Sequence, residues 1–148
     1  MIFARLVPEL PLLGDDQMSG PPDYRVTGIG QIAVNVHNLE RAVAFYRDTL
    51  GMQFLFEAPN MAFFQCGDVR LMLGLPDRPE LDHPASLIYY KVTDVDAAYE
   101  SLTGCGVRFE QAPGIVHRTD SHDLWMAFLR DSEGNLLALV NEVPRTSG

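Results

Sequence analysis

Basic residues and cysteines are scarce in this chain, and each scarcity argues against a class of protein. The 148 residues include 11 Lys and Arg against 20 Asp and Glu, which gives a net charge of -9. A negative field of this size repels phosphate backbones and anionic lipid headgroups, so we expect neither nucleic acid nor a membrane as partner. The two cysteines, Cys66 and Cys105, lie too far apart for a CxxC pair, which argues against a zinc knuckle or a redox dithiol.

Long apolar runs are missing as well. No stretch approaches the roughly 20 apolar residues that cross a bilayer as a helix. The apolar N-terminal stretch is interrupted by Arg5, Pro8, Glu9 and Pro11, which does not fit the uninterrupted centre of a secretion signal. With two free thiols and no span, we expect a cytoplasmic protein.

The length allows one sizeable hydrophobic core, since 47% of the 148 residues are apolar. Residues 1–24 are rich in Pro and Gly, which oppose helix and strand alike, and we interpret them as an N-terminal arm. This arm either docks on the domain or a partner subunit through its apolar residues, or remains a mobile tail. Residues 25–144 are expected to form a single domain.

The first half of that domain, residues 27–76, has the pattern of one helix among four strands. A β-type alternation begins at Ile29 and changes at Asn38 to helical spacing. With Asn38 as the N-cap and Gly51 as the stop, the pattern predicts a helix over residues 39–50. Three strands are predicted to follow, at 52–58, 61–66 and 69–75.

The second half, residues 85–143, repeats this order. The apolar positions of the first helix recur 56 residues later, behind a second N-cap at Asp94. Strands are predicted at 86–92, 107–111, 124–130 and 136–142, while residues 112–123 are predicted to form a long loop, a kind of segment that is often functional. The repeat indicates an internal duplication, and therefore an α+β domain of two tandem βαβββ modules.

Three stretches of the sequence carry a resemblance to a known family. They are IAVNVHNLERAVAFYRDTLGM, VTDVDAAYESLTGCGV and FLRDSEGNLLALVNEV. With these motifs the chain resembles the vicinal oxygen chelate superfamily, which includes glyoxalase I, methylmalonyl-CoA epimerase, extradiol dioxygenases, fosfomycin-modifying proteins and bleomycin-resistance proteins. The most specific motif is the turn Asp-x-x-Gly-Asn, because Gly134 and Asn135 both tolerate the positive backbone angles of a tight hairpin.

The resemblance implies a fold and a partner. The fold is the glyoxalase/bleomycin resistance/dihydroxybiphenyl dioxygenase-like fold, in which the two modules form a curled mixed sheet around a cleft for a small molecule. A second subunit often completes that cleft, so the resemblance implies a homodimer.

The resemblance also implies a metal position on each of four strands in the metal-dependent members. In this sequence the four positions fall on Gln31, Met72, Leu87 and Ala138. Divalent transition ions prefer His nitrogen or carboxylate oxygen from at least three groups, and here only Gln31 offers such a donor. We therefore expect no metal cofactor, and a divalent metal stays open only through a fallback set of Gln31, His117 and His122.

Side chains alternate across a strand, so every second residue lies on the same face. By analogy with the family, one such face of each sheet lines the cleft. Amide groups, an arginine fork and aromatic rings among them suit the orientation and stacking of an organic ligand. The expected substrate-binding residues are Gln31, Asn35, Arg70, Met72, Leu87, Tyr89, Trp125 and Ala138. Strand-edge pairing, ordinary packing or surface exposure is the alternative for each. Lys91, the only lysine, is more typical of a strand end whose ammonium stays in water.

The segment from His117 to Asp123 concentrates two histidines and two carboxylates. Histidine titrates near neutrality and can act as an acid or base, so His117 and His122 are the candidate catalytic residues. A solvated polar turn is the alternative for the whole segment.

Three functions remain open from the sequence. The leading hypothesis is a protein that binds a small apolar or aromatic metabolite without the family metal, for sequestration or for metal-free proton transfer. The second is a metal-dependent glyoxalase-like lyase or isomerase, or a dioxygenase, with substituted ligands. The third is a non-catalytic interaction module that kept the fold and lost the pocket.

Overall fold

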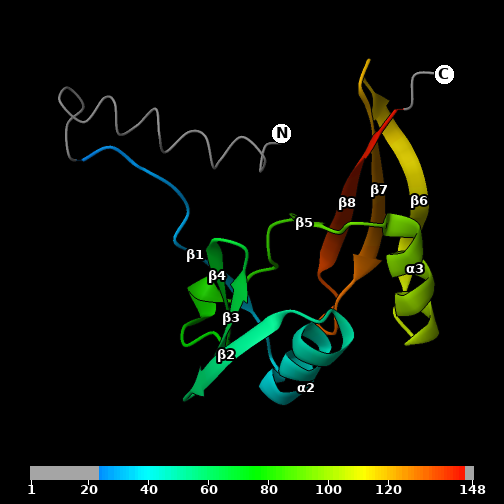
Figure 1. Ribbon diagram of the computed structural model, residues 1–148. Coiled ribbons are helices and arrows are strands. Elements are labelled where there is room, and N and C mark those ends of the chain that lie inside the picture. The colour runs from blue at the N-terminus through cyan, green and yellow to red at the C-terminus, as the bar shows by residue number, and fades with distance from the viewer. Residues whose placement is uncertain (1–23, 146–148) are drawn as a thin grey trace.

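The computed structural model describes residues 24–145, which fold into two modules of one sheet and one helical segment each (Figure 1). Nearly all of the expected N-terminal arm lies outside the described residues. The first module contains β1 (Gln31–Asn35), α2 (Leu39–Ala44), a π-helical segment (Phe45–Thr49), β2 (Gln53–Ala58), β3 (Met61–Cys66) and β4 (Val69–Gly74). Its four strands lie in the order β1-β4-β3-β2, with β1 parallel to β4.

The second module repeats this topology after a linker that holds a short 3-10 turn (Pro79–Leu81). It contains β5 (Ile88–Lys91), α3 (Val95–Gly104), β6 (Phe109–Arg118), β7 (His122–Arg130) and β8 (Leu136–Pro144). The strand order is β5-β8-β7-β6, and β5 is parallel to β8. The predicted pair of βαβββ modules is therefore the observed α+β fold.

Both helices begin at the predicted caps. The Asn38 side chain accepts a hydrogen bond from the Arg41 N–H at 3.0 Å, and the Asp94 side chain accepts one from the Ala97 N–H at 3.0 Å. Each bond satisfies a backbone donor that the first turn of a helix leaves unpaired. The first helix ends in the π-helical segment, where the Leu50 N–H donates to the Phe45 carbonyl at 2.9 Å.

The predicted loop over residues 112–123 is wrong. Residues up to Arg118 belong to β6, and only Thr119, Asp120 and Ser121 form the turn to β7. The β6–β7 ladder contains several register shifts, which break the alternation that identifies a strand in a sequence. Pro113 is compatible with β6 because this strand lies at the edge of its sheet.

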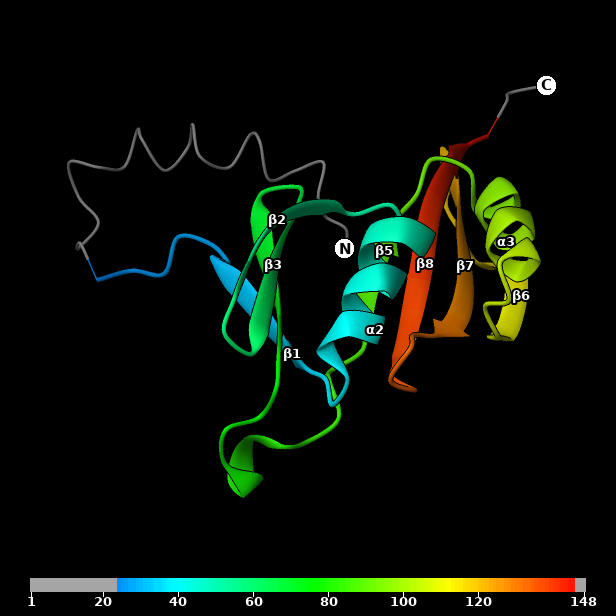
Figure 2. The same ribbon diagram turned by 90° about the horizontal axis from the view of Figure 1, so that it is seen from below.

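Each helix covers one face of its own sheet. In the first module, Ala42, Val43 and Tyr46 pack on a buried row of strand residues that includes Val34 and Leu71. In the second module, residues of α3 pack in the same way on the helix-facing rows of β7 and β8. Figure 2 shows α2 between the first sheet and β8, and α3 beside β6 and β7.

A few side chains belong to both cores and so join the modules. Phe45, Leu50 and Tyr90 pack against each of the two clusters. Burial of this apolar surface holds the modules together. It does not determine their relative orientation, because the hydrophobic effect has no direction.

A polar network at the turn after β7 supplies the directional contacts. The buried Asp131 carboxylate accepts hydrogen bonds from the Tyr46 hydroxyl at 2.7 Å, from the N–H groups of Glu133 and Asn135, and from the Asn135 amide. Burial, and then the charge of Asp131, raise the pKa of Tyr46, which keeps this hydroxyl protonated as a donor. The turn of the second module is thus bonded to the helix of the first.

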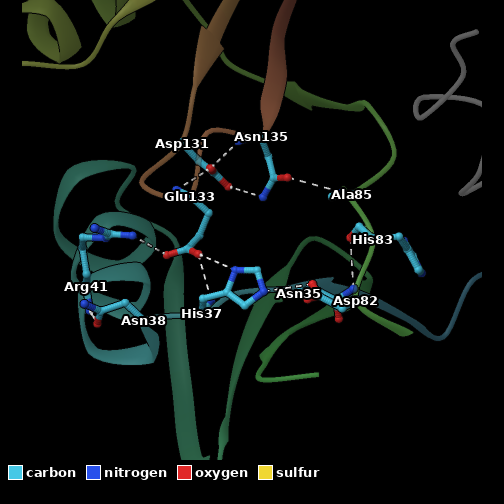
Figure 3. Close-up of polar contacts among 10 residues, drawn as sticks. All are labelled: Asn35, His37, Asn38, Arg41, Asp82, His83, Ala85, Asp131, Glu133 and Asn135. Atoms are coloured by element: carbon cyan, nitrogen blue, oxygen red, sulfur yellow. Dashed lines mark hydrogen bonds and ion pairs between the residues drawn. The ribbon is translucent and has the colours of Figure 1, made fainter. Parts of the chain in front are cut away.

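The same turn makes further contacts with the first module and the linker (Figure 3). Glu133 accepts hydrogen bonds from the Arg41 guanidinium at 2.9 Å and from the His37 N–H at 2.8 Å. The Asn135 carbonyl oxygen accepts from the Ala85 N–H at 3.3 Å. Asn135 therefore acts through its side chain, and only Gly134 has the positive backbone angle, with φ of 86°.

No helix in the described range from residue 24 to residue 145 is long and apolar enough to cross a membrane.

Replacement of Tyr46 by Phe should lower the free energy of unfolding by about 2 kcal/mol, because it removes a hydrogen bond to a buried charged group. Urea unfolding followed by circular dichroism measures this loss. Tyr99→Phe is the matched control, since the Tyr99 ring packs on Phe109 and its hydroxyl has no hydrogen-bond partner in the described range. A change of similar size in the control would contradict the assignment.

Glu133→Gln should change the pH dependence of stability. Burial alone raises the pKa of the Glu133 carboxyl, but the hydrogen bonds from His37 and Arg41 outweigh it and hold the pKa below its ordinary value of 4.5. A lowered folded pKa stabilises the fold above the unfolded pKa, and this contribution disappears as the pH falls through the folded value. The stability difference between wild type and variant should therefore shrink below about pH 4.5. A difference that stays constant from neutral to acidic pH would argue against the ion pair.

Candidate functional site on the open sheet faces

Each sheet has a second face that its helix does not cover, and most of the expected site residues lie there. On the first sheet this open face carries the row of Gln31, Ala33 and Asn35 together with Arg70 and Met72, which the register places beside them. On the second sheet it carries Tyr89, Ala138 and Phe128, which are cross-strand neighbours.

An aromatic and cationic cluster occupies the open face of the first sheet. Phe63 lies directly opposite Met72, and the Phe56 ring stacks on the Phe63 ring with centroids 4.6 Å apart. The Arg70 guanidinium lies over the Phe63 ring at 5.8 Å from its centroid. Phe56 is 47% exposed, so the cluster presents a flat apolar surface to its surroundings.

Two of the four family metal positions contact each other in this cluster. The Gln31 amide nitrogen donates to the Met72 thioether sulfur at 3.8 Å. A thioether is a soft, uncharged donor that does not suit the divalent ions of this chemistry. The Gln31 carbonyl oxygen is thus the one oxygen donor at the four positions, beside a thioether.

The other two positions are apolar. Leu87 lies one residue before β5 and is 38% exposed. Ala138 is fully buried in the open-face row between Tyr89 and Phe128, whose rings meet edge to face at 6.4 Å. The residues present at the four positions do not fit a divalent ion, since they offer one amide, one thioether and two hydrocarbon side chains.

The candidate catalytic histidines lie on two neighbouring strands of the second sheet, His117 on the edge strand β6 and His122 at the start of β7. His117 pairs with Leu124, and His122 begins β7, so the two histidines are diagonal neighbours on one face. Tyr89 lies on β5, at the opposite edge of the same sheet, which at about 4.8 Å per strand leaves roughly 14 Å across the sheet alone. The His122 ring contacts the Ser121 hydroxyl at 2.9 Å.

Two expected site residues have structural contacts instead. Asn35 donates its amide to the carbonyl oxygens of Leu81 and His83, the latter at 3.1 Å, and so holds the linker (Figure 3). Trp125 packs against the core under α3, on the opposite side of the sheet from Tyr89. Asn35 thus lies on the open face with its amide nitrogen engaged by the linker, whereas Trp125 lies on the other face.

The fallback metal set is divided between the two sheets. Gln31 belongs to the first sheet, whereas His117 and His122 belong to the second, and the sheets share no hydrogen-bonded strands. Among residues 24–145, no three His, Cys, Asp or Glu side chains group together in a way that could hold a metal ion.

Sequence reasoning missed Phe56, Phe63 and Phe128, which supply most of the aromatic surface. A usable signal was present for Phe63, because it alternates with Gln65 across from the row of Arg70 and Met72. Phe56 was hidden by a β-bulge between Phe54 and Phe56, which shifts the alternation by one residue.

Comparison with known proteins gives a family match and partial relatives. The sequence profile described as Glyoxalase/Bleomycin resistance protein/Dioxygenase superfamily matches residues 28–139. Metallothiol transferase FosB of Staphylococcus haemolyticus is 34% identical over 70 residues, which cover 47% of this chain and 48% of that protein. The match therefore spans about half of the length of this relative. The uncharacterized protein YraH of Bacillus subtilis is 28% identical over 123 residues, covering 74% of this chain and 94% of that protein.

Solved structures with the same fold include members of the superfamily. A glyoxalase/bleomycin resistance protein/dioxygenase superfamily member from Sphaerobacter thermophilus is 27% identical, with a TM-score of 0.65 over 79% of this chain and 98% of that chain. Lactoylglutathione lyase from Agrobacterium tumefaciens is 23% identical, with a TM-score of 0.59 over 82% of this chain and 95% of that chain. At this level of identity the second likeness shows the fold alone.

Protein purified without chelators should carry far less than one transition-metal ion per chain, because the four family positions offer no adequate donor set. Elemental analysis by mass spectrometry measures this ratio. A stoichiometric ion would contradict the expectation. The His117→Ala/His122→Ala double variant would then identify the ligands, since loss of the ion in that variant assigns it to the fallback set.

Proposed function

Because the chain belongs to the Glyoxalase/Bleomycin resistance protein/Dioxygenase superfamily, we propose that it binds a small, largely apolar or aromatic organic molecule on its open sheet faces and does so without a metal. The observation that carries this proposal is the replacement of the family metal positions by an apolar and aromatic surface. Met72 and Gln31 contact each other there, and Ala138 lies beside the rings of Tyr89 and Phe128.

The chemistry of the open faces supports an aromatic ligand with one polar group. Phe63 and Phe56 on the first sheet, and Tyr89 on the second, offer ring faces and edges for stacking. Arg70 is exposed and has no ion pair with a carboxylate in the described part of the chain, so its fork is available to a carbonyl or an anionic group. Gln31 adds an amide carbonyl that can accept a hydrogen bond.

Binding without turnover is the form of this function that we favour. Proton transfer needs an acid or base within hydrogen-bond reach of the reacting atom. His117 lies on the edge strand opposite Tyr89, and His122 lies roughly 20 Å along β7 from Phe128 at about 3.3 Å per residue, which separates both candidate bases from the aromatic surface.

A second copy of the chain is the proposed partner. Phe56 and Tyr89 are 47% and 49% exposed, and large exposed apolar side chains on an uncovered sheet mark interaction surfaces. In a homodimer the open face of one protomer would be covered by the partner, which would enclose the ligand and exclude water. Two free thiols are consistent with a reducing, cytoplasmic setting.

A panel of aromatic carbonyl and carboxylate compounds should contain ligands that raise the melting temperature, because a ligand that binds only the folded state stabilises it. Phe63→Leu and Tyr89→Leu should each weaken such a ligand roughly three- to tenfold, in line with the worth of an aromatic contact. Calorimetric titration measures the affinity, and Tyr99→Phe, behind the second sheet, is the matched control.

Two results would separate the alternatives. Unchanged binding in both leucine variants, or no stabilising compound in the panel, would contradict the proposal and favour an interaction module. If the protein turns a ligand over, His117→Ala/His122→Ala should lower the rate by about 100-fold or more while binding persists. Under our proposal the double variant binds as the wild type does.

A further inference from the structure

A cavity of about 590 Å³ lies between the two modules, on the opposite side of the first sheet from its open face. Its walls come from residues that face the helices, such as Ile32 and Leu71 of the first module and Ile88 and Leu139 of the second. Residues of α3 and of the turn between β3 and β4 complete it. Tyr89 and Lys91, which share the open-face side of β5, also border the cavity, so the cavity meets the open face of the second sheet along this edge strand.

The size and lining of this junction cavity are those of a ligand site. Small-molecule sites measure about 300–1,000 Å³ and combine apolar walls with a few polar groups. Here the walls are mostly aliphatic, and the polar side chains on them are few. They are Cys66, Tyr89, Tyr90, Lys91 and Ser101.

The lining of the cavity carries positive charge and no negative charge. Lys91 is the sole charged residue of the lining, and no carboxylate borders the cavity. Lys91 also has no ion pair in the described part of the chain, and it ends the edge strand β5 with its side chain exposed. The protein as a whole has a net charge of -9, so the charge at this cavity is opposite in sign to that of the chain.

Three of the polar residues of the lining, Cys66, Tyr90 and Lys91, lie near one another. Burial raises the pKa of the Cys66 thiol, and the nearby ammonium of Lys91 opposes that rise. The Tyr90 hydroxyl oxygen is buried and has no partner in hydrogen-bond geometry within residues 24–145. Burial, and then the proximity of Cys66, raise the pKa of Tyr90. These three residues therefore form a polar and cationic part of the lining.

We propose that the junction cavity is a second binding site, for a small organic carboxylate whose apolar body fills the aliphatic part while its carboxylate pairs with Lys91. The hydrophobic effect favours entry of any apolar chain of suitable size. The ammonium distinguishes among such chains, because a charge-assisted hydrogen bond favours an anion over its neutral isostere and a cation is repelled.

The selectivity is tested with three probes of equal chain length: octanoate, 1-octanol and octylammonium. Isothermal titration of the full chain should give the tightest binding for octanoate and the weakest for octylammonium. Lys91→Met should weaken octanoate roughly three- to tenfold and leave 1-octanol unchanged, while Lys91→Arg retains the cation and the preference. Equal affinities of the three probes, or an octanoate affinity that Lys91→Met does not change, would overturn the proposal.

The place of binding is tested with the thiol that lines the cavity. In a Cys105→Ser background, Cys66 is the single thiol, and octanoate should slow its alkylation by iodoacetamide in proportion to occupancy. The same protection should persist in Phe63→Leu, whose change lies on the open face. Octanoate that binds without protecting Cys66, or whose protection is lost in Phe63→Leu, would overturn the assignment to the junction cavity. If no compound of the aromatic panel binds, the open-face proposal fails, but the octanoate titration and the Cys66 protection still test the junction cavity. The two proposals can therefore fail independently.

Discussion

The buried carboxylate of Asp131 is the contact on which the relative position of the two modules depends. It accepts four hydrogen bonds, of which one comes from Tyr46, 85 residues away in the first module. The other three come from its own turn and hold Glu133 and Asn135 in the positions from which they contact the first module and the linker. A buried anion without such donors would be strongly destabilising, so the carboxylate and its donors must be assembled together. The relative position of the two open faces, and the shape of the junction cavity between the modules, both depend on this hydrogen-bonded contact.

Local signals in the sequence predicted most of the fold, because each depends on neighbours along the chain. Asn38 and Asp94 cap helices where the pattern predicted, and the 56-residue repeat corresponds to two sheets of identical strand order. The loop predicted at residues 112–123 failed because register shifts in β6 break the period of two. Asp131 was correctly placed in a turn, but its bond to Tyr46 is non-local and no pattern in the sequence encodes it.

The candidate site was predictable only in part. Gln31, Arg70, Met72 and Tyr89 lie on the open faces as alternation predicted, because residues two positions apart on a strand face the same way, and Ala138 lies there as the resemblance implied. Trp125 has the opposite parity and packs under α3, and Asn35 holds the linker. The aromatic residues Phe56 and Phe63 went unnoticed because their stacking joins two strands, one of them bulged.

The central claim is that the four family metal positions of this chain form part of an apolar binding surface. Crystals grown with excess Zn²⁺, Ni²⁺ or Mn²⁺ and measured at the absorption edge of each metal test it most directly. The account predicts no anomalous peak near Gln31, Met72, Leu87 or Ala138, and electron density for an aromatic ligand, when one is added, against Phe63 or Tyr89. An anomalous peak within coordination distance of Gln31, completed by donors from either protomer, would contradict it.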